Sequence, residues 1–387
     1  ESIDDISKLH NISVNKILLT NETSTKLYKD QTLFIPLEKK SSKNSELKSN
    51  KKYKIGLLLP FYINLNDTLT ASFEDKEEAS GIILGKSVMA LEFMQGVDLA
   101  LDSIKKLGIA IDMNIIDTRN DSAKVVDIIK SKVLDTMDLI IGPIYSRNMQ
   151  LVSEKYGSDR DKIIISPLSK SSDFLKNQVS TVQINTPFKQ QSKIISEFIK
   201  QKYDSQNIII CYDEQEKGLA LFMERKLDKM KNNISTMNMI YTHIDSIRNQ
   251  FLDTQIVILP SNNRAFVSRM LGTLGGIDSS FTVFGLSNLK NYDHLDIENM
   301  MHLDVHFPDP YYFNQHTKRD SLFLYNFEEK FLSSPSRFSK IGYNIMINFC
   351  VKELLFNLEK YRINGGQVNI NAPIVRYNNY FLERASF

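Results

Sequence analysis

The stretch that decides the fold of this 387-residue chain runs from Lys54 to Pro143, and it opens with the apolar run KIGLLLP at residues 54–60. Strand and helix patterns then alternate: a helix over Ser87–Leu107, a strand over Ile109–Ile116, a helix over Ser122–Leu134 and a strand over Leu139–Ile141. This alternation predicts parallel strands joined by right-handed crossovers. Such sheets bind ligands beyond the carboxyl ends of their strands, so we expect functional residues just after Pro60, Asp117 and Pro143.

The alternation continues to residue 286 after an extended segment at 182–185. We expect helices over 149–156, 188–202, 218–230, 246–252 and 264–274, and strands over 163–165, 208–212, 237–241, 256–259 and 281–286. Two strand–helix series joined by one crossing segment predict two lobes with a cleft between them.

Composition excludes several classes of protein. Lysine and arginine number 48 against 46 acidic residues, a net charge of +2, which gives no global attraction to nucleic acid. No apolar run approaches the roughly 18 residues of a membrane span. Two cysteines, Cys211 and Cys350, lie in apolar runs and are expected to be buried free thiols. Glu1 is not an initiator methionine, which leaves room for a removed leader or a lipid anchor upstream.

The first 36 residues form a small unit of their own. Ser2 is expected to cap a short helix in which Ile3, Ile6 and Leu9 form one stripe. The patterns S-I-x-x-I at 2–6, H-x-I-S-V at 10–14 and L-x-x-D-x-x-L-x-I-P at 27–36 resemble a lysin motif (LysM), a module that binds peptidoglycan and chitin.

The resemblance implies a partial LysM over 1–36, because the opening strand of the family would lie upstream of Glu1. It implies a weak glycan site at Ser2, Ile3, Leu27, Tyr28, Lys29 and Asp30, of which Asp30 stands where the family has a glycine. The alternative, a module that keeps its fold without binding glycan, stays open. Residues 37–52 carry six lysines against two glutamates and are predicted to be a basic flexible linker.

A second resemblance covers residues 51–387. It rests on F-x-x-G-x-x-L-A-x-D at 93–102, IGP at 141–143, SPLS at 166–169, QIN at 183–185 and F-x-x-I-G-Y at 338–343. In this order and spacing they resemble a type I periplasmic binding protein of the branched-chain amino-acid receptor superfamily. The resemblance implies an α/β fold, a two-lobed Rossmann-like domain over 53–387. The first lobe would comprise about 53–183 and 303–360, and the second about 186–300 and 361–387, with crossings near 301–310 and beyond Tyr361.

Receptors of that family hold the carboxylate and ammonium of an amino acid with small hydroxyl residues in loops of the first lobe. The resemblance implies a ligand site at Phe61, Tyr62, Tyr145, Ser146, Arg147, Leu168, Ser169, Lys170, Asp213, Lys217, Ser261 and Asn262. Arg147 and Lys170 add cations that suit a more acidic or larger ligand. The family's aromatic and acidic residues in the second lobe are replaced here, by Lys217 and by Ser261-Asn262, so an ammonium clamp is missing.

Catalytic alternatives are weaker. His302, Asp304 and His306 alternate, so on a strand they would share one face, either as metal ligands or, as we prefer, as a polar face with Leu303 and Phe307 inward. No nucleophile elbow, His-Glu-x-x-His or Cys-x-x-Cys motif occurs. We therefore predict no enzyme activity, metal or cofactor.

The leading hypothesis is an extracytoplasmic protein associated with the cell wall that binds a solute or peptide in its cleft. The rival hypothesis is a peptidoglycan-associated lipoprotein regulator that binds a partner protein, such as a cell-wall synthase, and no small ligand. Some outer-membrane lipoprotein activators of peptidoglycan synthases use the same fold in this way. Both hypotheses predict a location in the periplasm or at the outer membrane.

Overall fold

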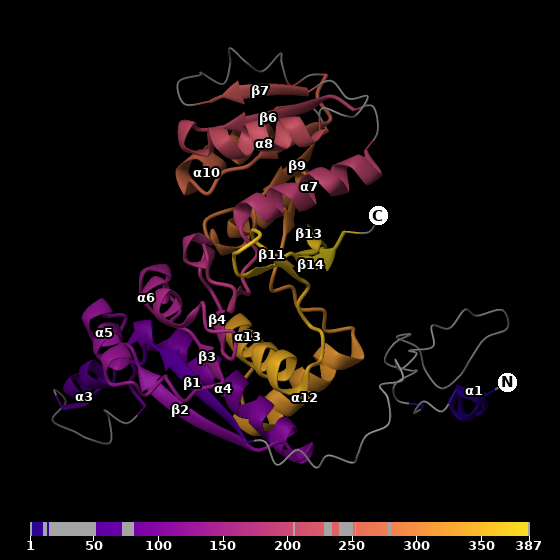
Figure 1. Ribbon diagram of the computed structural model, residues 1–387. Coiled ribbons are helices and arrows are strands. Elements are labelled where there is room, and N and C mark those ends of the chain that lie inside the picture. The colour runs from indigo at the N-terminus through magenta and orange to yellow at the C-terminus, as the bar shows by residue number, and fades with distance from the viewer. Residues whose placement is uncertain are drawn as a thin grey trace. The chain divides into compact units, whose positions relative to one another are not determined.

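The computed structural model describes residues 2–10, 14, 52–71, 81–203, 206–227, 234–239, 251, 253–277 and 280–385 (Figure 1). The chain divides into two compact units, one made of 1–51 and 313–334 and the other of 52–312 and 335–387. Nearly all of the predicted LysM and linker, including Leu27, Tyr28, Lys29 and Asp30, lies outside the described residues.

The smaller unit contains two described helices, α1 (Ile3–His10) and α12 (Lys318–Phe331). The predicted cap of α1 is confirmed: the Ser2 Oγ accepts from the Asp5 backbone N–H at 3.2 Å, and the Asp5 carboxylate accepts from the Ser2 N–H at 2.9 Å. The hydrogen bond from the Ser2 hydroxyl lowers the pKa of Asp5. The predicted stripe is only partly confirmed, because Ile3 is buried whereas Leu9 is 73% exposed.

The larger unit contains two seven-stranded sheets. The first sheet has the order β11-β12-β5-β4-β3-β1-β2 and is parallel except for β11. Its strands are β1 (Tyr53–Leu59), β2 (Ile111–Asp117), β3 (Leu139–Ile141), β4 (Ile163–Ser166), β5 (Thr181–Gln183), β11 (Leu358–Lys360) and β12 (Gln367–Asn369). Its helices are α3 (Ile63–Ala71), α4 (Gly85–Lys106), α5 (Ser122–Lys130), α6 (Ser146–Tyr156) and α13 (Arg337–Met346), the last continuing as a π-helical turn over Ile347–Val351.

The second sheet has the order β14-β13-β10-β9-β8-β6-β7, parallel from β10 to β7 and antiparallel at β13 and β14. Its strands are β6 (Ile208–Tyr212), β7 (Ile234–Asn238), β8 (Ile256–Leu259), β9 (Thr282–Gly285), β10 (His306–Pro308), β13 (Ile374–Asn378) and β14 (Phe381–Arg384). Its helices are α7 (Phe188–Lys202), α8 (Lys217–Leu227), α10 (Arg264–Gly275) and α11 (Ile297–His302).

Helices cover both faces of each sheet, which is why the central strands are continuous apolar runs. In β1, Ile55 and Leu57 pack in the core that α4 and α13 cover, whereas Leu58 packs in the core that α5 and α6 cover. The second sheet repeats this plan with α10 and α11 on one face and α7 and α8 on the other. Cys211 and Cys350 are buried free thiols, as expected, and burial raises the pKa of both.

Two glycines explain the F-x-x-G and I-G motifs. Gly96 on α4 and Gly342 on α13 lie where these helices touch, and a Cβ on Gly96 would be 1.7 Å from the carbonyl oxygen of Ser339. A Cβ on Gly342 would be 2.4 Å from the carbonyl oxygen of Phe93. Only glycine at these two positions allows α4 and α13 to come this close, and their contact covers the core that contains Ile55 and Leu57.

The crossings fall where they were expected, near 301–310 and beyond Tyr361, although each lies several residues after the approximate lobe limits of 303 and 361. β10 pairs with β9 and β13 in the second sheet, so the second crossing follows Pro308. β12 pairs with β5 in the first sheet, so the third crossing follows Asn369. Helix α3 was not predicted, because none of its residues is buried and its sequence lacks a clear apolar stripe. The helix predicted over 246–252 lies almost wholly outside the described residues.

The strand predicted for His302, Asp304 and His306 was also wrong. His302 ends α11, and Asp304 has the left-handed φ of 43°, so only His306 lies on a strand. Nor is His306 on a polar face, because it is fully buried and stacks on Phe284 with 5.2 Å between ring centroids. Within the described residues no cluster of three or more His, Cys, Asp or Glu side chains could hold a metal ion.

None of the helices in the described part of the chain is both long enough and apolar enough to cross a membrane.

Candidate functional site

A cavity of about 490 Å³ lies between loops of the two sheets and the crossing segments that join them. Five of the twelve predicted ligand residues line it: Tyr145, Ser146, Leu168, Ser169 and Lys170. Sequence reasoning missed most of the remaining wall, including Asn288, Lys290, Asn291, Asp309, Arg337 and Phe338.

The wall from the first lobe follows from the pairing of β3 with β4, whose carboxyl ends lie side by side. The loops beyond them bring the Oγ atoms of Ser146 and Ser169 to 2.5 Å, a hydrogen bond between hydroxyls. Gln183 fixes the second loop, since its Nε2 donates to the carbonyl oxygen of Ser169 at 2.8 Å. The Ser169 hydroxyl also lies 3.1 Å from the carbonyl oxygen of Ser171, so the loop after β4 fixes the position of the Ser169 hydroxyl, which in turn bonds to that of Ser146.

This wall is electropositive. Tyr145, the N-cap residue of α6, gives no side-chain hydrogen bond to the first turn, so the N–H groups of that turn have no side-chain cap. Lys170 is exposed and makes no ion pair with any described residue. A helix amino terminus beside a lysine favours an anion. Tyr311 on the crossing segment stays a neutral phenol, because burial raises its pKa.

The wall from the second lobe is a short 3-10 turn, Ser287–Asn291, here called η3. Gln191 of α7 positions it: Gln191 Nε2 donates to Ser287 Oγ at 2.9 Å, and the Ser287 N–H donates to Gln191 Oε1 at 3.0 Å. Lys290 then forms a 2.6 Å ion pair with Asp309, which is only 3% exposed. The other Asp309 oxygen accepts from the Tyr311 N–H at 3.0 Å, so each oxygen of this carboxylate accepts a hydrogen bond.

Arg337, the first residue of α13, joins the two walls. Its Nη1 donates to Asn291 Oδ1 of η3, and its guanidinium lies 4.7 Å from the ring centroid of Phe338. The helix end itself is capped, because the Ser336 Oγ accepts from the N–H groups of Phe338 and Ser339. A charged guanidinium in the cavity thus has a neutral amide as its partner.

Seven predicted residues do not line this cavity: Phe61, Tyr62, Arg147, Asp213, Lys217, Ser261 and Asn262. In the second lobe, Ser261 Oγ lies 3.2 Å from Asp213 Oδ2, and Lys217 pairs with Glu214 at 3.6 Å. The Asn262 N–H lies 3.4 Å from a Glu216 oxygen. The loops that follow β6 and β8 therefore hydrogen-bond to each other, and the predicted site residues in them do not line the cavity.

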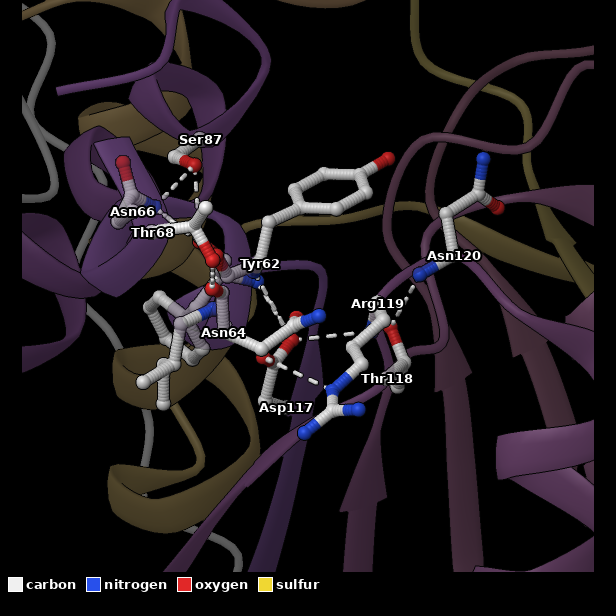
Figure 2. A network of polar contacts seen from close by, with 11 residues as sticks. Tyr62, Asn64, Asn66, Thr68, Ser87, Asp117, Thr118, Arg119 and Asn120 are labelled. Atoms are coloured by element: carbon white, nitrogen blue, oxygen red, sulfur yellow. Dashed lines mark hydrogen bonds and ion pairs between the residues drawn. The ribbon is translucent and has the colours of Figure 1, made fainter. Parts of the chain in front are cut away.

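Phe61 and Tyr62 belong to a polar network at the carboxyl ends of β1 and β2 (Figure 2). The Asp117 carboxylate accepts from the backbone N–H groups of Phe61, Tyr62, Ile63 and Arg119 at 2.9–3.1 Å. It thereby holds Tyr62 and Arg119 in left-handed conformations, with φ of 54° and 52°. Burial, which is the largest cause, raises the pKa of Tyr62.

The other end of the network joins α3 to α4. Asn66 Nδ2 donates to the Phe61 carbonyl at 3.0 Å and to Ser87 Oγ at 2.9 Å, and Asn66 Oδ1 accepts from the Leu84 N–H at 2.9 Å. Beside it lies a second cavity of about 420 Å³, mostly apolar and lined in part by Phe61, Leu91 and Met94. Exposed apolar side chains gather around it: Ile63 (54%), Ile83 (48%) and Ile115 (51%).

The fold is that of type I periplasmic binding proteins, and solved structures that match the chain are of this kind. A putative branched-chain amino acid ABC transporter protein from Rhodospirillum rubrum aligns with TM-score 0.66 and 12% identity over 87% of this chain and 100% of its own. An ABC transporter substrate-binding protein from Desulfitobacterium hafniense gives TM-score 0.60 and 14% identity over 87% and 100%.

LpoA from Haemophilus influenzae aligns with TM-score 0.53 and 11% identity over 88% of this chain and 60% of its own. At these identities the likeness establishes the fold alone. No protein-family model matches the chain, and no curated protein matches it.

Proposed function

We propose that this chain is a non-enzymatic binding protein that takes a small anionic solute or short peptide into the cavity between its lobes. The observation that carries the proposal is the wall of the first lobe, where the bonded hydroxyls of Ser146 and Ser169 adjoin Lys170 and the uncapped end of α6. The cavity volume of about 490 Å³ lies within the range of small-molecule sites.

Thermal melting and calorimetry against a panel of anionic and neutral solutes test this proposal. A ligand present at about 100 times its dissociation constant should stabilise the fold by about 2.7 kcal/mol. We expect Ser169→Ala and Lys170→Gln to weaken that binding, and Arg147→Gln, matched in charge but outside the cavity, to leave it unchanged. Binding that ignores Ser169 and Lys170 would count against the proposed wall.

The second candidate function is binding of a partner protein, and the apolar cavity beside α3 favours it. Ile63, Ile83 and Ile115 expose about half of their surface around one pocket, and clusters of this kind mark interaction sites. Co-purification from a cell-envelope extract, with the partner identified by mass spectrometry, tests this role. The same protein should be captured by the wild type and lost with both Ile63→Asp and Ile115→Asp, whereas Ser169→Ala should retain it.

We place the protein outside the cytoplasm, in the periplasm or at the outer membrane, because its fold is that of periplasmic binding proteins. From the LysM resemblance of residues 1–36 we also propose that the protein contacts peptidoglycan. Co-sedimentation with purified peptidoglycan, comparing the whole chain with one lacking residues 1–36, tests this contact. Equal sedimentation of both forms would assign any retention to residues 37–387.

A further inference from the structure

Arg337 is a cation of the cavity wall that forms no ion pair with a carboxylate of the described residues. We infer that it forms a second anion subsite, distinct from the Ser146–Ser169 wall, and that the ligand therefore carries two acidic groups and no free ammonium group. A second subsite presupposes that the cavity binds a ligand, as proposed above, and it specifies the chemical class of that ligand.

The guanidinium of Arg337 has a neutral hydrogen-bond partner. Its hydrogen bond goes to the amide of Asn291, which is neutral, and no ion pair joins it to a carboxylate of the described residues. A guanidinium has five N–H donors in a planar fork that matches a carboxylate in two parallel bonds. The guanidinium carbon lies 4.7 Å over the Phe338 ring, a cation–π contact that together with the Asn291 bond restrains the side chain.

Two other groups at this end of the cavity, Lys290 and the amino terminus of α13, could also attract an anion. Lys290 is already neutralised by Asp309 at 2.6 Å. The amino terminus of α13 is closed by the Ser336 side chain, which accepts from two of its N–H groups. Lys290 therefore adds no net positive charge here, and the first turn of α13 already has a side-chain cap. Recognition of a second acidic group therefore falls to Arg337.

The charges that line the cavity do not favour a free ammonium group on the ligand. Among the described residues that line the cavity Asp309 is the one carboxylate, and Lys290 already neutralises its charge while each of its oxygens accepts a hydrogen bond. A free ammonium would thus meet Lys170 and Arg337, both cationic, without a carboxylate to pair with. Charge complementarity favours a dicarboxylate, including an acidic amino acid whose nitrogen is acylated, with its carbon chain against the side chains of Leu168 and Phe338.

The experiment is isothermal titration calorimetry with matched probes. The diacids are N-acetyl-L-glutamate, glutarate, adipate and pimelate, and each is paired with the compound in which one carboxylate is an amide. L-Glutamate adds the free ammonium. We expect at least one diacid to bind about tenfold or more tightly than its monoamide, which is the typical worth of a charged hydrogen bond. We expect L-glutamate to bind more weakly than N-acetyl-L-glutamate.

Variants separate the charge of Arg337 from its contact with the second lobe. Arg337→Gln should remove the preference for the diacid and leave monoamide affinity unchanged. Asn291→Ser removes the partner of Arg337 but keeps the guanidinium, so the preference should persist. Arg225→Gln, an exposed position on α8 outside the cavity, is the matched control for loss of an arginine. Thermal melts of each variant confirm that it is folded.

The outcomes distinguish the two proposals. Diacids and monoamides that bind equally, or a preference that survives Arg337→Gln, would overturn the second subsite. If monoamides still bind and Ser169→Ala weakens them, the proposed function stands without it. A panel in which no diacid binds the wild type would overturn the second subsite, and the proposed function would be overturned only if the wider panel of anionic and neutral solutes also gave no ligand that depends on Ser169 and Lys170.

Discussion

Substitution of Gly96 by alanine tests the contact on which the first lobe depends. The new Cβ would lie 1.7 Å from a backbone oxygen of α13, whereas ordinary contact begins at 3.4 Å. A backbone oxygen cannot rotate away, so α4 and α13 must separate. Separation would loosen the packing of Phe93, Val97 and Ile341, each at most 3% exposed and each worth about 1.5–3 kcal/mol when fully buried.

The expected magnitude follows from these opposing terms. Overpacking costs about 1–3 kcal/mol, loss of apolar contact adds to it, and the better helix propensity of alanine returns about 1 kcal/mol. We expect Gly96→Ala to lower the free energy of unfolding by about 3 kcal/mol. Urea unfolding followed by circular dichroism measures this change.

Gly272 provides the control. It lies inside α10, and a Cβ there would meet no atom within 4 Å, so Gly272→Ala should raise the free energy of unfolding by about 0.5–1 kcal/mol. The two substitutions are chemically identical and should have opposite signs. A Gly96→Ala protein as stable as the wild type would refute the close approach of α4 and α13.

Three further predictions concern polar groups. Asp117→Ala removes the acceptor of four backbone N–H groups and should lower the free energy of unfolding by about 2 kcal/mol. Asp117→Asn keeps one oxygen as an acceptor and should lower it by less, and urea unfolding of both variants measures the difference. Lys290→Met leaves Asp309 buried without its cation and should cost about 2 kcal/mol, and adding Asp309→Asn should recover most of the loss. Burial lowers the pKa of His306 below 6.5, so stability should fall as pH drops from 7.5 to 5.5, and His306→Phe should flatten that slope.

The sign of the pH effect depends on the surroundings of His306. Its Nδ1 lies 2.7 Å from the carbonyl oxygen of Asp304, and its buried Nε2 has no partner among the described residues. Burial is the largest cause and lowers the pKa of His306, Arg376 and Lys202 lower it further, and Asp304 raises it by less than these lower it. The unfolded chain therefore binds the proton more tightly. A wild-type protein that gains stability toward pH 5.5 would contradict this reasoning.

The fold was predictable because its central strands are buried on both faces. Runs such as 208–212 and 256–259 contain only apolar residues or tyrosine, and turn residues or a proline bound them, so their limits matched the structure. Helix α3 was not predicted, because it has no buried side chain and hydrophobic periodicity in a sequence reveals only helices with a buried face. The strand proposed for 302–306 failed because alternation of three polar residues cannot reveal that Asp304 turns the chain.

The two walls of the cavity differ in what determines them. Ser146 and Ser169 each follow a strand whose neighbour is known from the order of the sheet, so short-range sequence places them together. The opposite wall depends on distant pairs: Gln191 with Ser287, 96 residues apart, and Arg337 with Asn291, 46 apart. No local motif encodes such pairs, because they form only when segments far apart in the sequence pack together, and the Arg337–Asn291 pair also requires the chain to cross between lobes. The groups that we propose to select among ligands are therefore the ones that sequence reasoning identifies last, and Arg337 is where the class of ligand should first be tested.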